Sequence, residues 1–301
     1  MKPMPGPLVI TGREGPDLDG AACTIALAAL YERLGVEATP VVSGRPDAEA
    51  QFVLDRLGIQ TIANLDAKPN GVVLVDASDT IGLPAFVDPH AVTRVIDHRA
   101  HHQAHERFPN AVIEIELVGA AATLIFEQFV EAKVVPGESA AMLLLAAILS
   151  NTQHLRGSVT TGRDTAAAAH LQALFPLPPG FVEAQFQARR ADIVADLGAS
   201  ISRETKTFEH PDGPFLVSQL ECPGATGLVA ECTPLLIALG RRSVVNLVDP
   251  VLATSVLVVP DDEFRAWVRA ATGFTFEGPV AASSPALLRK QIVARIVGGG
   301  S

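Results

Sequence analysis

Three short acidic segments in the first half of the chain each follow an apolar run, and their side chains could hold metal ions. They contribute the residues Asp17, Asp19, Asp76 and His98. Carboxylate oxygens favour hard divalent ions such as Mg²⁺ and Mn²⁺, and neutral imidazole is a common nitrogen ligand. Such ions bind phosphate oxygens and activate water. The sequence therefore predicts a metal site that could bind phosphate groups.

The apolar runs that precede these residues are predicted to be strands of one parallel sheet. Leu8–Thr11, Gly71–Val75 and Arg94–Ile96 alternate with segments of helical periodicity, as in βαβ units. The carboxyl ends of parallel strands border one crevice, so we expect the acidic segments to lie together there. The remaining expected strands of this half span 36–42 and 111–116, and its expected helices span 20–34, 48–57, 121–130 and 138–149.

Ordinary structural roles compete with metal binding at several of these positions. Asp17 and Asp19 stand where a helix begins, and aspartate is a favourable helix cap. Asp79 is expected to cap the turn after the strand, whereas Asp76 ends an apolar strand, where a buried carboxylate is costly unless it is paired or metal-bound. Surface positions are expected for three further histidines, His101, His102 and His105.

The second half of the chain is predicted to form a smaller domain. At 301 residues the chain can hold two domains, and the proline-rich stretch Phe175–Gly180 interrupts the βα alternation. We expect an α/β fold with a parallel-sheet domain over 1–188, a linker near 186–198 and a mixed α/β domain over 196–301. A polar helical segment is expected at 182–196, before the second domain. The expected strands of the second domain span 205–208, 215–221, 243–248 and 254–259, and its expected helices lie near 225–239 and 262–271.

Composition limits the classes of partner. The formal net charge of −10 disfavours nucleic acid and anionic membranes as ligands, because phosphate backbones need a cationic surface. The apolar stretch Ala140–Leu149 is too short for a membrane span and suits a buried helix. Three cysteines without CxxC spacing indicate reduced core thiols and a cytoplasmic location. Met1–Pro7 is too short for a signal peptide, and Gly298–Ser301 is expected to be a flexible tail.

Several motifs, taken in order along the chain, resemble the DHH phosphoesterase superfamily and most closely the manganese-dependent (family II) inorganic pyrophosphatases. Besides Pro-Asp-x-Asp at 16–19, the strand-end Asp76 and Asp97-His98, the similar segments are Gly44–Glu49, Val118–Leu124, Ile148–Thr152 with Thr160, Thr161 and Asp164, Glu204–Phe208, and Arg289–Gln291. Each motif is weak by itself. The ordered set, which spans nearly the whole chain, is specific.

The resemblance implies a hydrolase with a DHH metal-binding domain and a C-terminal, DHHA2-like domain that clamps the substrate, which lies in the cleft between them. The implied metal is Mn²⁺ or Mg²⁺, with Co²⁺ as a further candidate, and the implied substrate is a small phosphorylated compound such as pyrophosphate. By this resemblance the metal ligands are Asp17, Asp19, Asp76 and His98, with Asn151 at a further ligand position, Asp76 is catalytic, and Lys206, Arg289 and Lys290 bind the substrate. We also predict a catalytic role for Arg99 and a substrate-binding role for Arg13. A homodimer is also compatible with the resemblance.

Three positions depart from the family pattern, and all three concern the chemistry. Arg13 and Arg99 stand where the family has histidines, and Asn151 stands where it has an aspartate. Because guanidinium groups cannot coordinate a metal, we expect fewer ions than the family's two. In one interpretation, Arg13 fills a vacated metal position beside Asp17 and Asp76. In the other, Arg99 binds the substrate phosphate directly, and one ion is enough for a phosphoester reaction.

Three functions therefore stay open at this point. The first is a metal-dependent phosphohydrolase that resembles inorganic pyrophosphatase. The second is a catalytically impaired relative that binds a phosphorylated ligand or a protein partner. The third is an oligonucleotide phosphodiesterase, which is disfavoured because the chain lacks the Gly-Gly-Gly-His signature of that branch of the superfamily.

Overall fold

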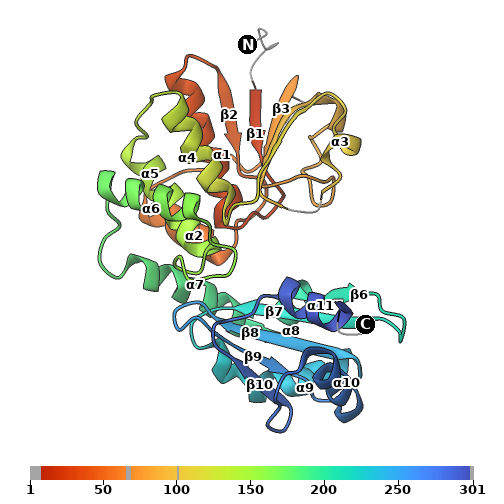
Figure 1. Cartoon of the computed structure of the whole chain (residues 1–301). Helices are drawn as coiled ribbons and strands as arrows, with labels where there is room; N and C mark the ends of the chain where they lie inside the picture. Colours follow the sequence, from red (N-terminus) through yellow and green to blue (C-terminus); the bar gives the residue numbers. More distant parts are fainter. Residues whose placement is uncertain (1–7, 66–68, 100–101, 299–301) are drawn as a thin grey trace. The chain divides into compact units, whose positions relative to one another are not determined.

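The computed structural model describes residues 8–65, 69–99 and 102–298, and the chain divides into two compact units (Figure 1). The first unit comprises Met1–Leu155 and Val159–Gln185, and the second comprises Arg156–Ser158 and Phe186–Ser301. The division falls within one helix, α7 (Phe181–Ala195). Three predicted features lie outside the described residues: the segment Met1–Pro7, His101, and the last three residues of the expected tail.

The first unit is built on a five-stranded sheet in which every pairing is parallel, in the order β2–β1–β3–β4–β5. This confirms the predicted α/β class. The chain runs from β1 to β2 on one side and returns to β3 on the other, so the strand order reverses between β1 and β3. Ligands of open α/β sheets bind outside the carboxyl ends of the strands at such a point. The strands are β1 (Leu8–Thr11), β2 (Ala38–Val41), β3 (Gly71–Val75), β4 (Val92–Asp97) and β5 (Val112–Ile115).

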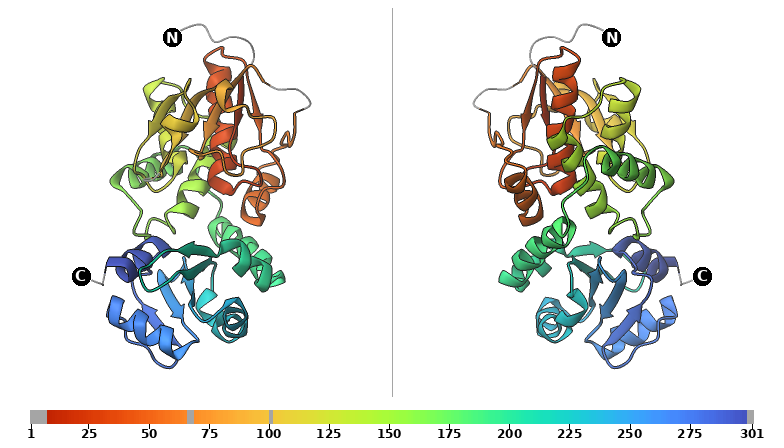
Figure 2. Two further views of the ribbon diagram at one scale, coloured as in Figure 1. Left: turned by 90° about the vertical axis from the view of Figure 1, so that its right-hand side faces the viewer. Right: turned by 90° about the vertical axis from the view of Figure 1, so that its left-hand side faces the viewer.

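Helices pack around this sheet and supply much of the core (Figure 2). The central strand β3 reads GVVLV and is buried along its whole length, as expected for a strand covered on both faces. Helix α5 is apolar on all sides and buried from Ala140 to Ser150, which confirms the buried helix predicted there. The helices are α1 (Leu18–Arg33), α2 (Ala48–Arg56), α3 (Ala104–Arg107), α4 (Ala121–Glu131), α5 (Glu138–Asn151) and α6 (Gly162–Leu174).

The second unit has a mixed five-stranded sheet in the order β10–β9–β8–β7–β6, with β7 and β8 parallel and the other pairs antiparallel. The mixed α/β character was predicted, whereas α8, β10 and α11 were not. The strands are β6 (Lys206–Phe208), β7 (Phe215–Glu221), β8 (Ser243–Asp249), β9 (Thr254–Val258) and β10 (Val280–Ser283). The helices are α8 (Leu197–Glu204), α9 (Val229–Leu239), α10 (Asp262–Thr272) and α11 (Arg289–Gly298), which includes the first residue of the expected tail.

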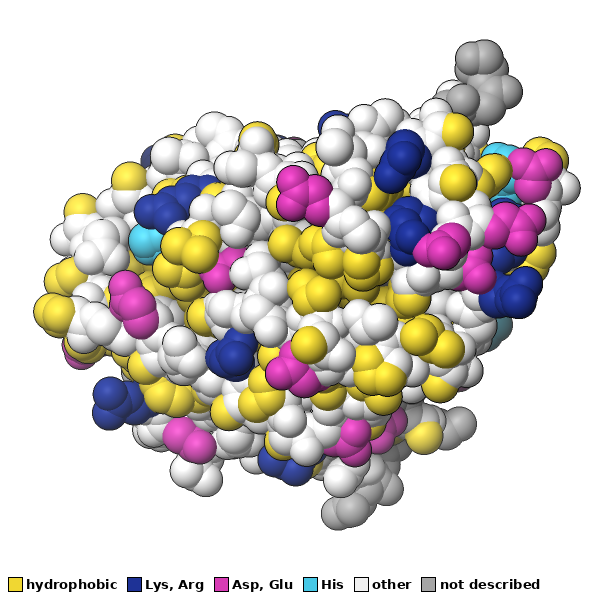
Figure 3. All heavy atoms as spheres, turned by 90° about the horizontal axis from the view of Figure 1, so that it is seen from below, with side chains coloured by type: hydrophobic (Ala, Val, Ile, Leu, Met, Phe, Trp, Pro, Cys, Tyr) yellow, Lys and Arg dark blue, Asp and Glu magenta, His cyan; other side chains and the backbone are white. Residues whose placement is uncertain are grey.

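The thiols agree with the expectation from the sequence. On the face shown in Figure 3, the described lysine and arginine side chains are dispersed among acidic and apolar ones. The three cysteines, Cys23, Cys222 and Cys232, are buried and free, as predicted. Within the described ranges, no helix combines the length and apolar character needed to cross a membrane.

Candidate metal centre

Asp19 lies in the first turn of α1 and is completely buried. Its carboxylate accepts hydrogen bonds from the backbone N–H groups of Ala121 and Ala122, each at 2.8 Å. These amides begin α4, which has no side-chain cap of its own at Ala120. Asp19 therefore caps a helix 102 residues further along the chain, where the positive end of the helix dipole stabilises a carboxylate.

Asp17 has the local capping role that competes with metal binding in the sequence. Its Oδ1 accepts from the backbone N–H of Gly20 at 3.0 Å and caps α1. Gly20 brings the two acidic segments together, because a Cβ atom there would lie 3.5 Å from Asp76 Oδ2 and 3.6 Å from Asp17 Oδ1. The carboxylates of Asp17 and Asp76 thus border the same spot at the start of α1.

Asp76 directly follows β3 and adopts a left-handed backbone conformation with φ of +50°. Its backbone N–H donates to the carbonyl oxygen of Ile96 at 2.9 Å, so the neighbouring strand β4 holds it in place. Positive φ is costly for a residue with a Cβ atom and occurs often at functional sites. In this conformation the Asp76 carboxylate lies beside Gly20, at the start of α1.

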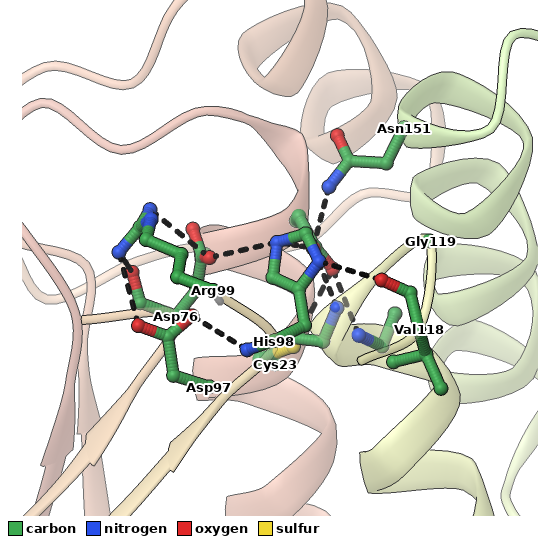
Figure 4. Close-up of polar contacts among 12 residues, drawn as sticks. Cys23, Asp76, Asp97, His98, Arg99, Val118, Gly119 and Asn151 are labelled. Atoms are coloured by element: carbon green, nitrogen blue, oxygen red, sulfur yellow. Dashed lines mark hydrogen bonds and ion pairs between the residues drawn. The ribbon is translucent and has the colours of Figure 1, made fainter. Parts of the chain in front are cut away.

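His98 follows β4 and completes the group. Its Nδ1 is 3.0 Å from the carbonyl oxygen of Val118, and its Nε2 lies 3.5 Å from Asp76 Oδ1 and 3.8 Å from Asp19 Oδ2 (Figure 4). The ligand atoms of Asp19, Asp76 and His98 all lie within 4.8 Å of one another. Of the described residues, these three form the one His, Cys, Asp and Glu group with the spacing to share an ion.

Burial and mutual charge shift the acidity of this group. Burial, reinforced by the negative charge of Asp76, raises the pKa of Asp19. For His98, burial would lower the pKa, but the hydrogen bond to Asp76 and the charge of Asp19 outweigh it and raise it to about 10. Without an added cation, the imidazolium therefore offsets part of the negative charge of this group.

Arg99 contributes a second cation to the same group. Its guanidinium donates to the carbonyl oxygen of Asp76 at 2.9 Å, to Asp76 Oδ1 at 3.2 Å and to Asp97 Oδ2 at 3.2 Å. Asp97 is completely buried and also accepts from the backbone N–H of His98 at 2.7 Å. The sequence assigns no site role to Asp97, the first residue of the Asp97-His98 motif. Its role in the site is to bind the Arg99 side chain, whose position only the tertiary structure shows.

The other two altered positions have partners of different kinds. Asn151, the last residue of α5, has its side-chain Nδ2 directed toward Asp19 Oδ2 at 2.6 Å (Figure 4). Arg13 forms an ion pair of 2.7 Å with Asp79. Asp79 also accepts from the backbone N–H of Ile81 at 2.8 Å and so caps the turn, as predicted.

The three predicted phosphate-binding cations of the C-terminal half all lie in the second unit. Lys206 is the exposed first residue of β6, and the exposed Lys290 is the second residue of α11. Arg289 begins α11, donates to the backbone oxygen of Glu204 and has its Nη2 3.9 Å from the carboxylate of Glu204. The structure thus places Arg289 beside the segment that leads into β6.

Comparison with known proteins agrees with this geometry. The manganese-dependent inorganic pyrophosphatase of Bacillus subtilis is 33% identical over 172 residues, which are 54% of this chain and 54% of that protein. A Deinococcus radiodurans protein described as a probable manganese-dependent inorganic pyrophosphatase is 34% identical over 167 residues, 54% of this chain and 52% of that protein. The chain is homologous to manganese-dependent inorganic pyrophosphatases. It spans about half the length of the curated relatives it matches, and none of the family models matches it.

Solved structures show the same fold over nearly the whole chain. A Methanococcus jannaschii protein provisionally described as a family II inorganic pyrophosphatase has a TM-score of 0.70 at 20% identity, covering 97% of this chain and 99% of that one. An exopolyphosphatase-related protein from Bacteroides fragilis has a TM-score of 0.51 at 10% identity, covering 97% and 91%. The homology and the fold together confirm the resemblance predicted from the motifs.

Proposed function

We propose that the chain is a metal-dependent phosphohydrolase resembling inorganic pyrophosphatase, which hydrolyses a phosphoanhydride or phosphoester. The observation that carries this proposal is the group of Asp19, Asp76 and His98 at the β1/β3 switch point, with Arg99 attached to it. Homology to manganese-dependent pyrophosphatases supports the same chemistry.

The donor set suits Mn²⁺ or Mg²⁺, with Co²⁺ as a further candidate. Two carboxylates offer hard oxygen ligands, and His98 Nε2 faces them while Nδ1 is held by a backbone carbonyl. We assign Asp19, Asp76 and His98 as ligands, with Asp17 at their edge and Asn151 able to turn its oxygen inward. A bound ion would supply a nucleophilic hydroxide near neutral pH and charge neutralisation for the phosphoryl group.

We infer that the site holds fewer ions than the two of the family pattern. Asp76 Oδ1 already accepts from Arg99, and Asp19 Oδ2 already faces the Asn151 amide. Arg99 carries a permanent positive charge, and about a third of its side chain is exposed to solvent. In this scheme Asp76 and Arg99 act catalytically, with Arg99 as the fixed cation that stabilises charge on the phosphoryl oxygens.

Substrate binding is assigned to four further cations, and the substrate is a small phosphorylated compound such as pyrophosphate. Lys206, Arg289 and Lys290 of the second unit are proposed to bind phosphate oxygens, as is Arg13, whose guanidinium is held by Asp79. We also propose that the protein is cytoplasmic and forms a homodimer.

A catalytically impaired relative that binds a phosphorylated ligand or protein partner is the second candidate. It is favoured by the Asn151 amide, which faces Asp19 with its nitrogen and so presents a donor where a ligand is needed. Arg99 adds a charge that repels a cation at the same place.

Phosphate release decides between these functions. Purified full-length protein is incubated with Mn²⁺, Mg²⁺ or Co²⁺ and with pyrophosphate or a panel of phosphoesters. We expect turnover that Asp76→Asn abolishes, whereas Asp88→Asn, at the exposed cap of a 3₁₀ turn, leaves it unchanged. Absence of phosphate release with every ion and substrate, combined with calorimetric binding of pyrophosphate, would establish the binding function instead.

A further inference from the structure

We propose that Asp164, at the start of α6, is a positioning residue that fixes both His98 and Asp19 in the metal-binding group. Asp164 is completely buried and lies outside that group. Its effect on metal binding rests on the proposed function, whereas its effect on the geometry of His98 does not. The link runs through the segment Val118–Gly119 and the first turn of α4.

Asp164 gathers four hydrogen bonds from two distant parts of the chain. Its Oδ2 accepts from the backbone N–H and the hydroxyl of Thr161, each at 2.7 Å, which completes the capping box of α6. The same oxygen accepts from the backbone N–H of Gly119 at 2.9 Å, and Oδ1 accepts from the hydroxyl of Thr123 at 2.6 Å. A helix cap alone needs only the contacts with Thr161, so the contacts with Gly119 and Thr123 call for a further explanation.

One peptide unit connects Asp164 to His98. The N–H of Gly119 donates to Asp164, and the C=O of Val118, in the same peptide bond, is the partner of His98 Nδ1 at 3.0 Å (Figure 4). A trans peptide is planar, and its N–H and C=O point in opposite directions. Asp164 and His98 therefore hold opposite edges of one rigid plane. Fixing that plane directs His98 Nδ1 to the carbonyl and leaves Nε2 toward Asp19 and Asp76.

The same carboxylate also steadies the site of Asp19. The contacts with Gly119 and Thr123 bracket the amides of Ala121 and Ala122, which bind the Asp19 carboxylate. The approach is close at Gly119, where a Cβ atom would lie 2.9 Å from Asp164 Oδ2 and 2.6 Å from Thr152 Cγ2. Asp164 thus anchors one backbone segment that touches two of the three proposed ligands.

Manganese affinity and the His98 ring proton test this role together. In full-length protein we expect Asp164→Asn to weaken Mn²⁺ binding about 10- to 100-fold, the range found for partners that orient a ligand. Asp261→Asn is the matched control, because it removes an aspartate cap from α10 in the second unit and should leave Mn²⁺ affinity unchanged. The Nδ1–H resonance of His98, identified by its loss in His98→Gln, should be protected from exchange in wild type and in Asp261→Asn, and lost in Asp164→Asn.

A second pair of variants keeps the test decisive if Asp164→Asn does not fold. Thr123→Val removes one hydroxyl donor to Asp164 at nearly constant shape, whereas Thr123→Ser retains it. We expect Thr123→Val to weaken Mn²⁺ binding on the order of fivefold, the value of about one hydrogen bond, and Thr123→Ser to restore it.

Two outcomes separate this inference from the proposed function. If wild type binds Mn²⁺ and the Asp164 and Thr123 variants bind it equally well with an unchanged His98 resonance, the positioning role is wrong and the metal-dependent function stands. If wild type binds no Mn²⁺, Mg²⁺ or Co²⁺, the metal-dependent function is wrong, and the His98 resonance alone decides the positioning role.

Discussion

Arg99 holds Asp76 at two points, through the backbone carbonyl at 2.9 Å and through the carboxylate at 3.2 Å. The same guanidinium reaches the buried carboxylate of Asp97. The contact thus fixes both the main chain and the side chain of a residue whose φ is +50°. An arginine where the family pattern has a histidine therefore acts as a structural brace and as a cation within the candidate site.

Arg99 and Asp97 are expected to be energetically coupled. Arg99→Gln leaves Asp97 buried without its cation and should lower the free energy of unfolding by about 2 kcal/mol, less than for a fully buried pair because 34% of the Arg99 side chain is exposed. Asp97→Asn in the same background should recover part of the loss. Urea denaturation of wild type, both single variants and the double variant gives the coupling energy, and strictly additive effects would contradict the pairing.

Asn151→Asp is expected to change stability and metal affinity in opposite directions. The substitution replaces a donor 2.6 Å from Asp19 with a second carboxylate. In metal-free protein the two charges repel, which should lower the free energy of unfolding by about 1–3 kcal/mol. With Mn²⁺ the new carboxylate becomes a ligand, and the affinity should rise. Denaturation with chelator and calorimetry with Mn²⁺ measure the two effects. Asn151→Ala, which removes the donor without adding a charge, should not raise the affinity.

Gly119→Ala should destabilise the protein because there is no room for the added methyl group. Its Cβ atom would lie 2.6 Å from Thr152 Cγ2, and relieving such overpacking costs about 1–3 kcal/mol. Gly162→Ala provides a matched comparison. Apart from its chain neighbours and the backbone of its own helix, no described atom lies within 4 Å of the added Cβ, and alanine favours the helix. Thermal unfolding of the two variants should differ in sign or clearly in size, and equal effects would show that Gly119 is not confined.

Acid should weaken the contribution of Asp164 to stability. Burial would raise the pKa of Asp164, but hydrogen bonds from Thr123, Thr161 and Gly119 outweigh it and hold the pKa below its usual value of 3.8. Because the folded pKa is depressed, the stabilisation is complete above the unfolded pKa and is lost as the pH falls through the folded one. The stability difference between wild type and Asp164→Asn should therefore shrink below about pH 4. Urea titrations from pH 7 to pH 3 measure it, and a constant difference would contradict the expectation.

Local sequence signals were sufficient for most elements of the first unit. Gly71–Val75 forms β3 as expected, and α1, α4 and α5 lie within a few residues of their predicted ranges. The spacing and content of apolar residues predict such elements because both are local features, read from a short stretch of sequence. By contrast, α6 is rich in alanine with little amphipathic contrast, and β10 has four residues, so neither gave a clear local signal.

The sequence by itself determined the kinds of chemical group, their order along the chain and the strand ends that carry them. It could also show that Arg13, Arg99 and Asn151 depart from a family pattern. Only the tertiary structure decided their partners: Asp79 for Arg13, Asp76 and Asp97 for Arg99, and Asp19 for Asn151. These contacts join residues up to 132 positions apart in the sequence. Hydrogen bonds and ion pairs form only when two groups lie within a few ångströms of each other, and the order of residues along the chain does not show which groups do so.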